Sequence, residues 1–217
     1  MMKEGINNIT NINFTAQKVA CAKNTYKGIT THLNIFKLGA SDNKFLKTLL
    51  EKDFFIKDSA TNLSEEKMKI WKDVLKLSIF NSMEKDNISY LATFNNKPCG
   101  LISMQGKNPL NLLNLVAIPI DGDKKANLVG KTLLYKSFAD ACKNKVKKIS
   151  LEAVKNSPGD PLKKYLDIGF EKIEEGSRYV QMECSRENIK KQLHSLKKEV
   201  NLKECNPKNF DLNRYLD

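Results

Sequence analysis

Hydrophobic and polar positions form blocks along this chain, and the period of each block predicts its secondary structure. Helical spacing of apolar residues predicts four helices. One follows Asp42, a second starts near Ser64, and the other two cover about 127–143 and 162–168. Strand patterns cover 31–38, 88–94, 99–105, 112–118, 148–154, 170–174 and 178–183, and the run over 112–118 is typical of a fully buried strand. The order of these elements predicts one α+β domain.

The two ends of the chain do not follow these patterns. Residues 1–30 are rich in Asn, Thr and Lys without a sustained period, which predicts a mostly irregular arm with one short strand at 12–14. Ser185 caps a predicted helix whose narrow apolar stripe is enough for docking on another surface, and residues 205–217 have no readable pattern. We therefore expect a domain over 31–184, between an N-terminal arm over 1–30 and a C-terminal basic helix and tail over 185–217.

The composition limits the classes of function. Of the 217 residues, 41% are hydrophobic and 29% are charged, which suits a packed core. No apolar run reaches the roughly 18 residues of a membrane span, and residues 1–24 lack a signal-peptide pattern, so we expect a cytoplasmic protein without membrane contact. The 5 Cys have no CxxC spacing and there are only 2 His, which argues against a disulfide scaffold and against a metal site.

The net charge of +12 indicates an anionic partner or a solvated basic surface. Because 34 of the 37 basic residues are Lys, the charge is weaker evidence for nucleic acid than an excess of Arg would be. Residues 118–148 hold eight Lys against three Asp, a local excess of +5 around a predicted loop and helix start. The charge therefore favours a phosphorylated small molecule and leaves nucleic acid as a weaker alternative.

A strand that ends at Pro119, a basic loop and a helix with Gly130 in its first turn follow one another. This order resembles the GNAT superfamily of acyl-CoA N-acyltransferases, and the resemblance covers about 31–184. In that family an Arg/Gln-x-x-Gly-x-Gly/Ala loop opens the helix, whose N–H groups face the pyrophosphate of CoA. In this chain Lys125 stands at the Arg or Gln position and Leu128 at the first Gly position, so only Gly130 keeps the pattern.

The resemblance implies a mixed, mostly antiparallel sheet flanked by helices, and acetyl-CoA as co-substrate. Val116 and Ile118 would offer main-chain groups to the pantetheine arm. The loop and the first helical turn would bind the pyrophosphate, and their residues are Lys124, Lys125, Ala126, Asn127, Leu128, Val129, Gly130, Lys131 and Thr132. Asn156 would contact the pantetheine, or it would equally well form a turn after the strand over 148–154.

Tyr165, Gly169 and Phe170 match a short helix of the family, in which a Tyr stands four residues before a Gly-Phe pair. The resemblance implies that the Tyr165 hydroxyl protonates the departing CoA thiolate, a role that suits a phenol. The alternative is a core aromatic residue. Glu152 is the nearest candidate for the base that takes a proton from the amine, and the alternative is an outward, solvated Glu152 with an ordered water as the base.

The expected function is transfer of an acetyl group from acetyl-CoA to a primary amine, by direct attack in a ternary complex. The acceptor stays open among a protein amine, a polyamine, an aminoglycoside and other amines, and we expect a monomer or a homodimer. The alternative function is a non-catalytic GNAT-like module whose basic surface contacts RNA, a ribosome or another protein.

Overall fold

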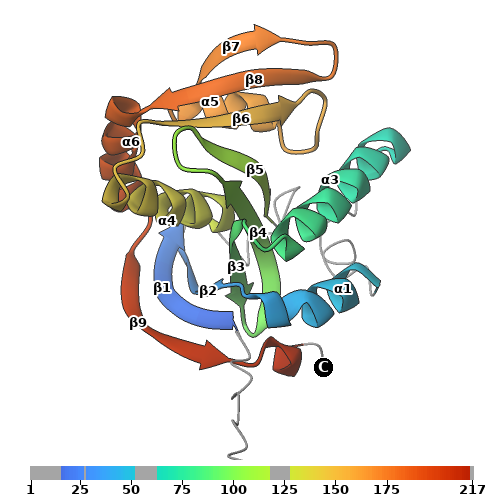
Figure 1. Ribbon diagram of the computed structural model, residues 1–217, viewed down its shortest axis with the longest axis vertical. Helices are drawn as coiled ribbons and strands as arrows, with labels where there is room; N and C mark the ends of the chain where they lie inside the picture. The colour runs from blue at the N-terminus through green and yellow to red at the C-terminus, as the bar shows by residue number, and fades with distance from the viewer. Residues whose placement is uncertain (1–15, 27, 52–62, 118–127, 216–217) are drawn as a thin grey trace, which may run out of the picture.

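Nine strands form one continuous sheet among the residues that the computed structural model describes, which are 16–26, 28–51, 63–117 and 128–215 (Figure 1). The strand order is β7-β8-β6-β5-β4-β3-β2-β1-β9. The strands are β1 (Ala16–Tyr26), β2 (Ile29–Lys37), β3 (Ile88–Phe94), β4 (Lys97–Gln105), β5 (Leu110–Ala117), β6 (Lys148–Val154), β7 (Glu171–Glu175), β8 (Tyr179–Ser185) and β9 (Leu202–Phe210). Only β5 and β6 pair in parallel among them, so the predicted mixed, mostly antiparallel sheet is confirmed.

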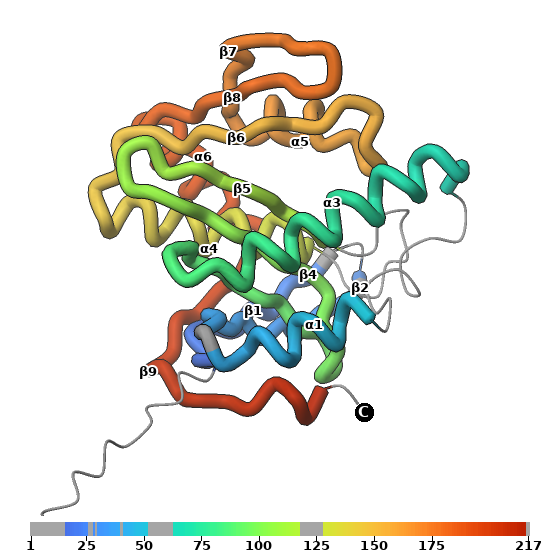
Figure 2. Tube along the Cα trace, turned by 45° about the vertical axis from the view of Figure 1, so that its right-hand side comes forward, coloured from blue at the N-terminus to red at the C-terminus, as the bar shows by residue number. Residues whose placement is uncertain are grey.

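Helices cover both faces of this sheet (Figure 2). On one face lie α1 (Asn43–Glu51) and α3 (Glu65–Met83), and on the other lie α4 (Val129–Lys143) and α5 (Pro161–Asp167). The helix α6 (Arg186–Glu199) packs against α4, and two 3-10 turns, η1 (Ala40–Asp42) and η2 (Leu212–Tyr215), complete the described elements. No helix in these ranges is both long and apolar enough to cross a membrane.

The helix starts follow from their capping residues. The Ser64 hydroxyl accepts a hydrogen bond from the Lys67 N–H at 3.4 Å, and the Ser185 hydroxyl accepts one from the Asn188 N–H at 3.2 Å. Each cap supplies an acceptor to one of the free N–H groups of the first turn. Both helix starts are therefore where the sequence predicts them.

Most predicted strands are also confirmed, but β5 is not fully buried. Its side chains alternate between buried and half-buried positions from Leu110 to Ala117. The prediction of a fully buried strand over 112–118 is therefore wrong for the residues that are described. The half-buried side chains are those of Asn111, Leu113, Leu115 and Ala117.

The two ends of the chain pair with each other, because β1 lies between β2 and β9 and is antiparallel to both. The prediction of a mostly irregular arm is wrong for residues 16–26, while the short strand predicted at 12–14 lies outside the described residues. The Phe210 ring lies 5.1 Å from the Phe36 ring between centroids, which fixes the tail against β2. The strands β1 and β9, which belong to the two predicted arms, thus extend the sheet.

The start of α4 lies very close to the sheet at Gly100 of β4. A Cβ atom at Gly100 would lie 2.5 Å from Val129 Cγ1 and 3.2 Å from the carbonyl oxygen of Val116. Only glycine leaves room for this approach. Gly100 therefore sets the start of α4 against the end of β5, where the candidate site lies.

Candidate functional site

Strands β5 and β6 part in the middle of the sheet. Their pairing joins residues 110–112 to 149–151 and ends there, although both strands continue. One extra residue of β5, Leu113, lies between the partners of Ser103 and Met104, and such a bulge bends the strand. In the described sheet, the peptide groups of β5 that face away from β4 have no strand partner beyond this point. They form an edge on which an extended ligand can pair.

The helix α4 begins beside this opening. A Cβ atom at Gly130, in the first turn of α4, would lie 3.6 Å from the Cβ of Ala117, the last residue of β5. The first N–H groups of a helix have no acceptor within the helix, and together with the helix dipole they favour an anion. The site thus joins an unpaired strand edge to an anion-binding helix start.

Leu128 precedes α4 in the left-handed conformation, with φ at 60° and ψ at 22°. Its carbonyl oxygen accepts hydrogen bonds from the N–H and from the hydroxyl of Thr132, both at 2.8 Å. This conformation is open to glycine, whereas it costs a leucine about 1–2 kcal/mol. The turn therefore has a backbone conformation that favours glycine, and Leu128 adds a half-buried side chain to it.

Two of the predicted phosphate-binding side chains have protein partners. Lys131 Nζ forms an ion pair with the Glu199 carboxylate of α6 at 2.5 Å. The buried Thr132 hydroxyl accepts a hydrogen bond from Asn24 Nδ2 of β1 at 2.9 Å, besides its bond to Leu128. These contacts hold the helix start in place, so what α4 offers to an anion in this state is its backbone N–H groups.

The predicted cofactor site also includes residues outside the described ranges and two buried valines. Ile118, Lys124, Lys125, Ala126 and Asn127 lie outside the described residues. Val129 is buried against Gly100, and Val116 is a buried residue of β5 next to the opening. The side chains of both valines belong to the core, which leaves their main-chain groups for a ligand.

Tyr165 lies in α5, on the same face of the sheet as α4. Its ring packs edge-on against Phe170 with the centroids 5.5 Å apart, and Phe170 in turn lies 6.2 Å from Phe138 of α4. Tyr165 is only 8% exposed, and this burial raises the pKa of its hydroxyl above the ordinary value of 10.0. The hydroxyl is therefore protonated at neutral pH, as a proton donor must be.

Glu152 lies on the opposite face of β6 from Tyr165. Its neighbours Leu151 and Ala153 are buried, while Glu152 itself is exposed. It directly follows the last pair between β5 and β6, so its carboxylate stands on the α3 face beside the opening. Asn156 is exposed in a turn with φ at 58°, a conformation that Asn tolerates well, and this favours its role as a turn residue.

Asn114 is a polar residue of the opening to which sequence reasoning assigned no role. It stands opposite Ser103, whose hydroxyl contacts Ser82 of α3, so Asn114 also faces α3. Its Oδ1 accepts a hydrogen bond from Asn81 Nδ2 at 3.2 Å, but its Nδ2 has no partner among the described residues, although only 7% of the residue is exposed. A buried donor without an acceptor costs about 1–3 kcal/mol. The signal in the sequence was the one Asn, Asn114, within the apolar run over 112–118.

No protein-family model matches the sequence, and no similar sequence is found among curated proteins. Solved structures are similar at low identity. The PaiA N-acetyltransferase from Thermoplasma acidophilum, solved in complex with coenzyme A, is 24% identical with a TM-score of 0.50 over 70% of this chain and 98% of that chain. An aminoglycoside 6′-acetyltransferase type Ii is 13% identical with a TM-score of 0.52 over 70% of this chain and 96% of its own.

A GCN5-related N-acetyltransferase from Rhodopseudomonas palustris is 17% identical, with a TM-score of 0.50 over 70% of this chain and 94% of that chain. All three structures match over nearly their whole length, and all three carry an acetyltransferase name. At these identities the likeness concerns the arrangement of helices and strands. The chain therefore has the fold of the GNAT N-acetyltransferases, as its motifs predict.

Proposed function

We propose that this protein transfers an acetyl group from acetyl-CoA to a primary amine, by direct attack in a ternary complex. The observation that carries the proposal is the gap between β5 and β6 beside the start of α4. The free edge of β5 suits the amide groups of an extended pantetheine arm, and the N–H groups of α4 suit a pyrophosphate. The similar structure with bound coenzyme A adds support for such a ligand.

The reaction needs one proton acceptor and one proton donor. The amine nitrogen attacks the carbonyl carbon of the thioester, the C–N bond forms, and the C–S bond then breaks. Glu152 takes a proton from the acceptor ammonium before attack, directly or through a water, since it is exposed beside the opening, and the proton that nitrogen loses after attack passes to solvent. Tyr165 gives its proton to the departing thiolate from the other face of the sheet and regains one from solvent.

Asn114 gives the opening a further hydrogen-bond donor. Its Nδ2 is buried and has no partner within the part of the chain that the structure describes, while Asn81 holds its Oδ1 and thereby fixes the plane of the amide. A donor in this state stabilises negative charge on a thioester oxygen, or orders the water that carries the proton to Glu152. We therefore assign Asn114 to the acyl-binding end of the site.

The first test is calorimetric titration of the full chain with acetyl-CoA, followed by release of CoA in the presence of a panel of amines. We expect binding, and Tyr165→Phe should lower kcat by about 10²–10⁴ while affinity for acetyl-CoA stays nearly unchanged. Tyr135→Phe, a change at a partly buried Tyr of α4, is the matched control and should keep kcat. No binding at millimolar acetyl-CoA would refute the proposal.

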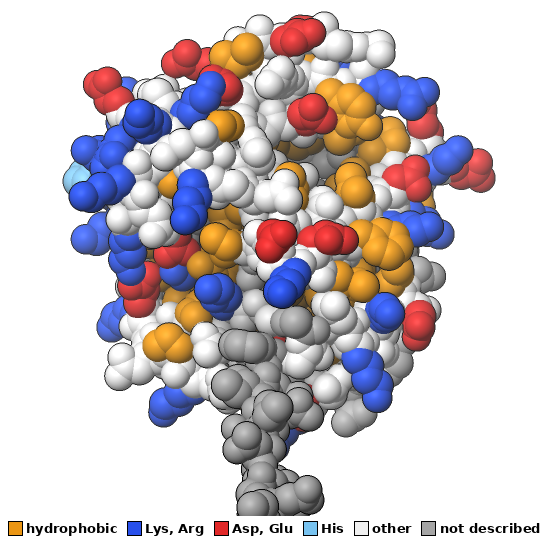
Figure 3. Space-filling model, viewed as in Figure 1, with side chains coloured by type: hydrophobic (Ala, Val, Ile, Leu, Met, Phe, Trp, Pro, Cys, Tyr) orange, Lys and Arg blue, Asp and Glu red, His pale blue; other side chains and the backbone are white. Residues whose placement is uncertain are grey.

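A second candidate function rests on the basic surface of α6. Its exposed residues include Lys190, Lys191, Lys197 and Lys198, and basic side chains gather over α6 in Figure 3. Such a face favours a non-catalytic module that contacts RNA, a ribosome or another protein. Binding to RNA that weakens steeply between about 50 and 200 mM salt would support this alternative. A flat response to salt would exclude electrostatic binding of RNA by this face.

A further inference from the structure

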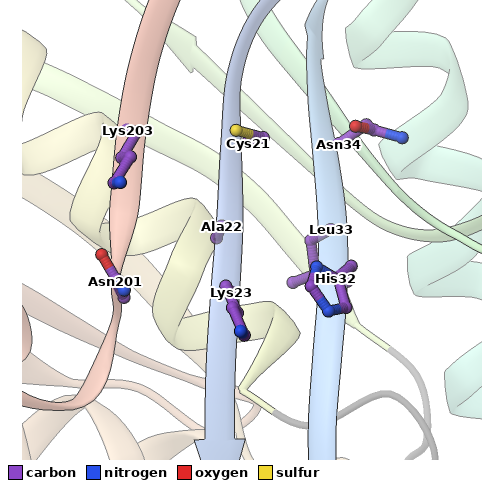
Figure 4. A pocket seen from close by; sticks show the side chains of 8 residues that line it. All are labelled: Cys21, Ala22, Lys23, His32, Leu33, Asn34, Asn201 and Lys203. Carbon is purple, nitrogen blue, oxygen red and sulfur yellow. The ribbon is translucent and has the colours of Figure 1, made fainter.

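A small cavity lies on the outer strands of the sheet, away from the opening between β5 and β6 (Figure 4). Its volume is about 190 Å³. The residues that line it come from β2, β1 and the region of β9, and they are Cys21, Ala22, Lys23, His32, Leu33, Asn34, Asn201 and Lys203. The strands β1 and β9 are the paired ends of the chain, so the cavity is built largely from the segments that extend the sheet.

The sheet itself separates this cavity from α4. Ala22 and Asn24 of β1 are buried on the α4 face, where Asn24 contacts Thr132. Cys21 and Lys23 alternate with them and therefore project from the opposite face. In Figure 4 the side chains of Lys23 and His32 lie in front of the strands, with α4 behind them. An anion in the cavity would thus occupy a place distinct from the anion-binding start of α4.

The cavity brings basic groups together without a compensating acid. Lys23 stands directly opposite His32 in the antiparallel pair, and Lys203 stands opposite Cys21 on the other side. No carboxylate lines the cavity, and neither Lys23 nor Lys203 forms an ion pair with the described residues. Cations placed on neighbouring strands repel one another, and a bound anion would offset this repulsion because it attracts both cations.

On the opposite face of β9 the lysines are paired with an acid. There Glu204 accepts Lys136 Nζ at 3.3 Å and Lys143 Nζ at 2.5 Å. The neighbouring residue Lys203 faces the cavity and has no such acid among the residues that the structure describes. The charge that is balanced on one face of the strand is therefore left unbalanced on the other face.

The donors of this open cavity suit a small anion. A water molecule occupies about 30 Å³ in the liquid, so the cavity corresponds to roughly six waters. It offers two ammonium groups, an imidazole and the side-chain amides of Asn34 and Asn201, which together are many donors for one group. Lysine binds phosphate as a point charge. We propose that this cavity binds a phosphate group, either as inorganic phosphate or as a small phosphate monoester.

The test is a titration of the full chain in phosphate-free buffer, followed by backbone amide NMR shifts. Inorganic phosphate and glycerol 3-phosphate are the two probes, and acetate at the same ionic strength is the control anion. We expect saturable shifts at residues of β1, β2 and β9 with the phosphate probes and no saturation with acetate. Tighter binding of glycerol 3-phosphate than of inorganic phosphate would assign the site to a monoester, and the reverse order would assign it to free phosphate.

Variants then test the residues. The double variant Lys23→Gln/Lys203→Gln should weaken phosphate binding at least tenfold, and Lys203→Glu should abolish it. Lys191→Gln, a change at an exposed Lys of α6, is the matched control and should bind as the unaltered chain does. All three lysines are exposed, so the amide spectrum should stay that of the folded protein. Equal affinity in the double variant, or shifts centred on the start of α4, would overturn the proposal, and neither result depends on acetyl transfer.

Discussion

Leu128→Gly tests whether the start of α4 is an anion site. It also tests whether the Leu128 side chain keeps a phosphate from approaching the backbone N–H groups closely. Leu128 has φ at 60°, in the left-handed region, directly before the free N–H groups of the helix. Glycine adopts this conformation freely, and its lack of a Cβ lets a phosphate come closer to the N–H groups. The substitution therefore acts on stability and on cofactor affinity, and the two effects can be worked out separately.

The stability terms nearly cancel. Release of the left-handed strain favours the variant by about 1–2 kcal/mol. Greater freedom of the unfolded chain costs about 0.4–1 kcal/mol, and loss of a half-buried Leu side chain costs about 1 kcal/mol, roughly half of the value for full burial. The free energy of unfolding should therefore change by less than about 1 kcal/mol, which corresponds to a Tm shift within about 2–4 °C for a chain of this size.

Cofactor affinity should change much more. One added hydrogen bond to a charged phosphate contributes about 1.5–3 kcal/mol, which lowers the Kd for CoA tenfold or more. Leu128→Ala is the control, because it keeps the Cβ and the strain while it loses the packing, so it should lower stability by about 1 kcal/mol and leave the Kd nearly unchanged. Calorimetric titration and thermal unfolding measure both quantities. An unchanged or higher Kd for Leu128→Gly would refute the assignment of the pyrophosphate to this helix start.

Further substitutions and pH test other parts of the structure. Gly100→Ala forces a Cβ against α4 and should lower stability by about 1–3 kcal/mol in thermal unfolding, and an unchanged Tm would contradict the close approach. Lys136→Met leaves two partly exposed acids of α4 and β9 without their shared cation and should cost roughly 1–3 kcal/mol in urea unfolding. Because burial raises the pKa of Tyr165, its proton is retained as pH rises, and kcat should show no loss from this group below about pH 10. Burial also raises the pKa of the thiols of Cys99 and Cys184, so iodoacetamide at pH 8 should leave both unmodified by mass spectrometry while exposed cysteines react.

The centre of the fold could be predicted because its local signals agree with its final contacts. The β3–β4 hairpin turns at Asn95 and Asn96, whose φ angles of 48° and 63° lie in the region that Asn tolerates. The strand predicted over 148–154 coincides with β6. In both cases the residues that determine the secondary structure lie within the element or next to it in the sequence.

The outer strands could not be predicted for a physical reason. The buried face of β1 carries Ala16, Ala20 and Ala22 with the polar Asn24, which is too small and too mixed to give a strong strand pattern. Its partner β9 lies near the other end of the chain, and that strand is exposed along most of its length. The stability of both strands comes from their mutual pairing, and no local period records that pairing. The gap between β5 and β6 depends on which residues of the two strands pair, and no local period in the sequence records that pairing either.

The resemblance to the GNAT motif located the helix start but not the role of each side chain there. A motif fixes where the backbone turns, whereas Lys131 and Thr132 found partners in segments outside the motif, namely Glu199 of α6 and Asn24 of β1. These contacts attach both ends of the chain to the first turn of α4. A helix start held from two sides keeps its N–H groups in one direction before any ligand arrives, which lowers the ordering cost of binding. The strands and helix that sequence reasoning treated as arms therefore belong to the support of the candidate site.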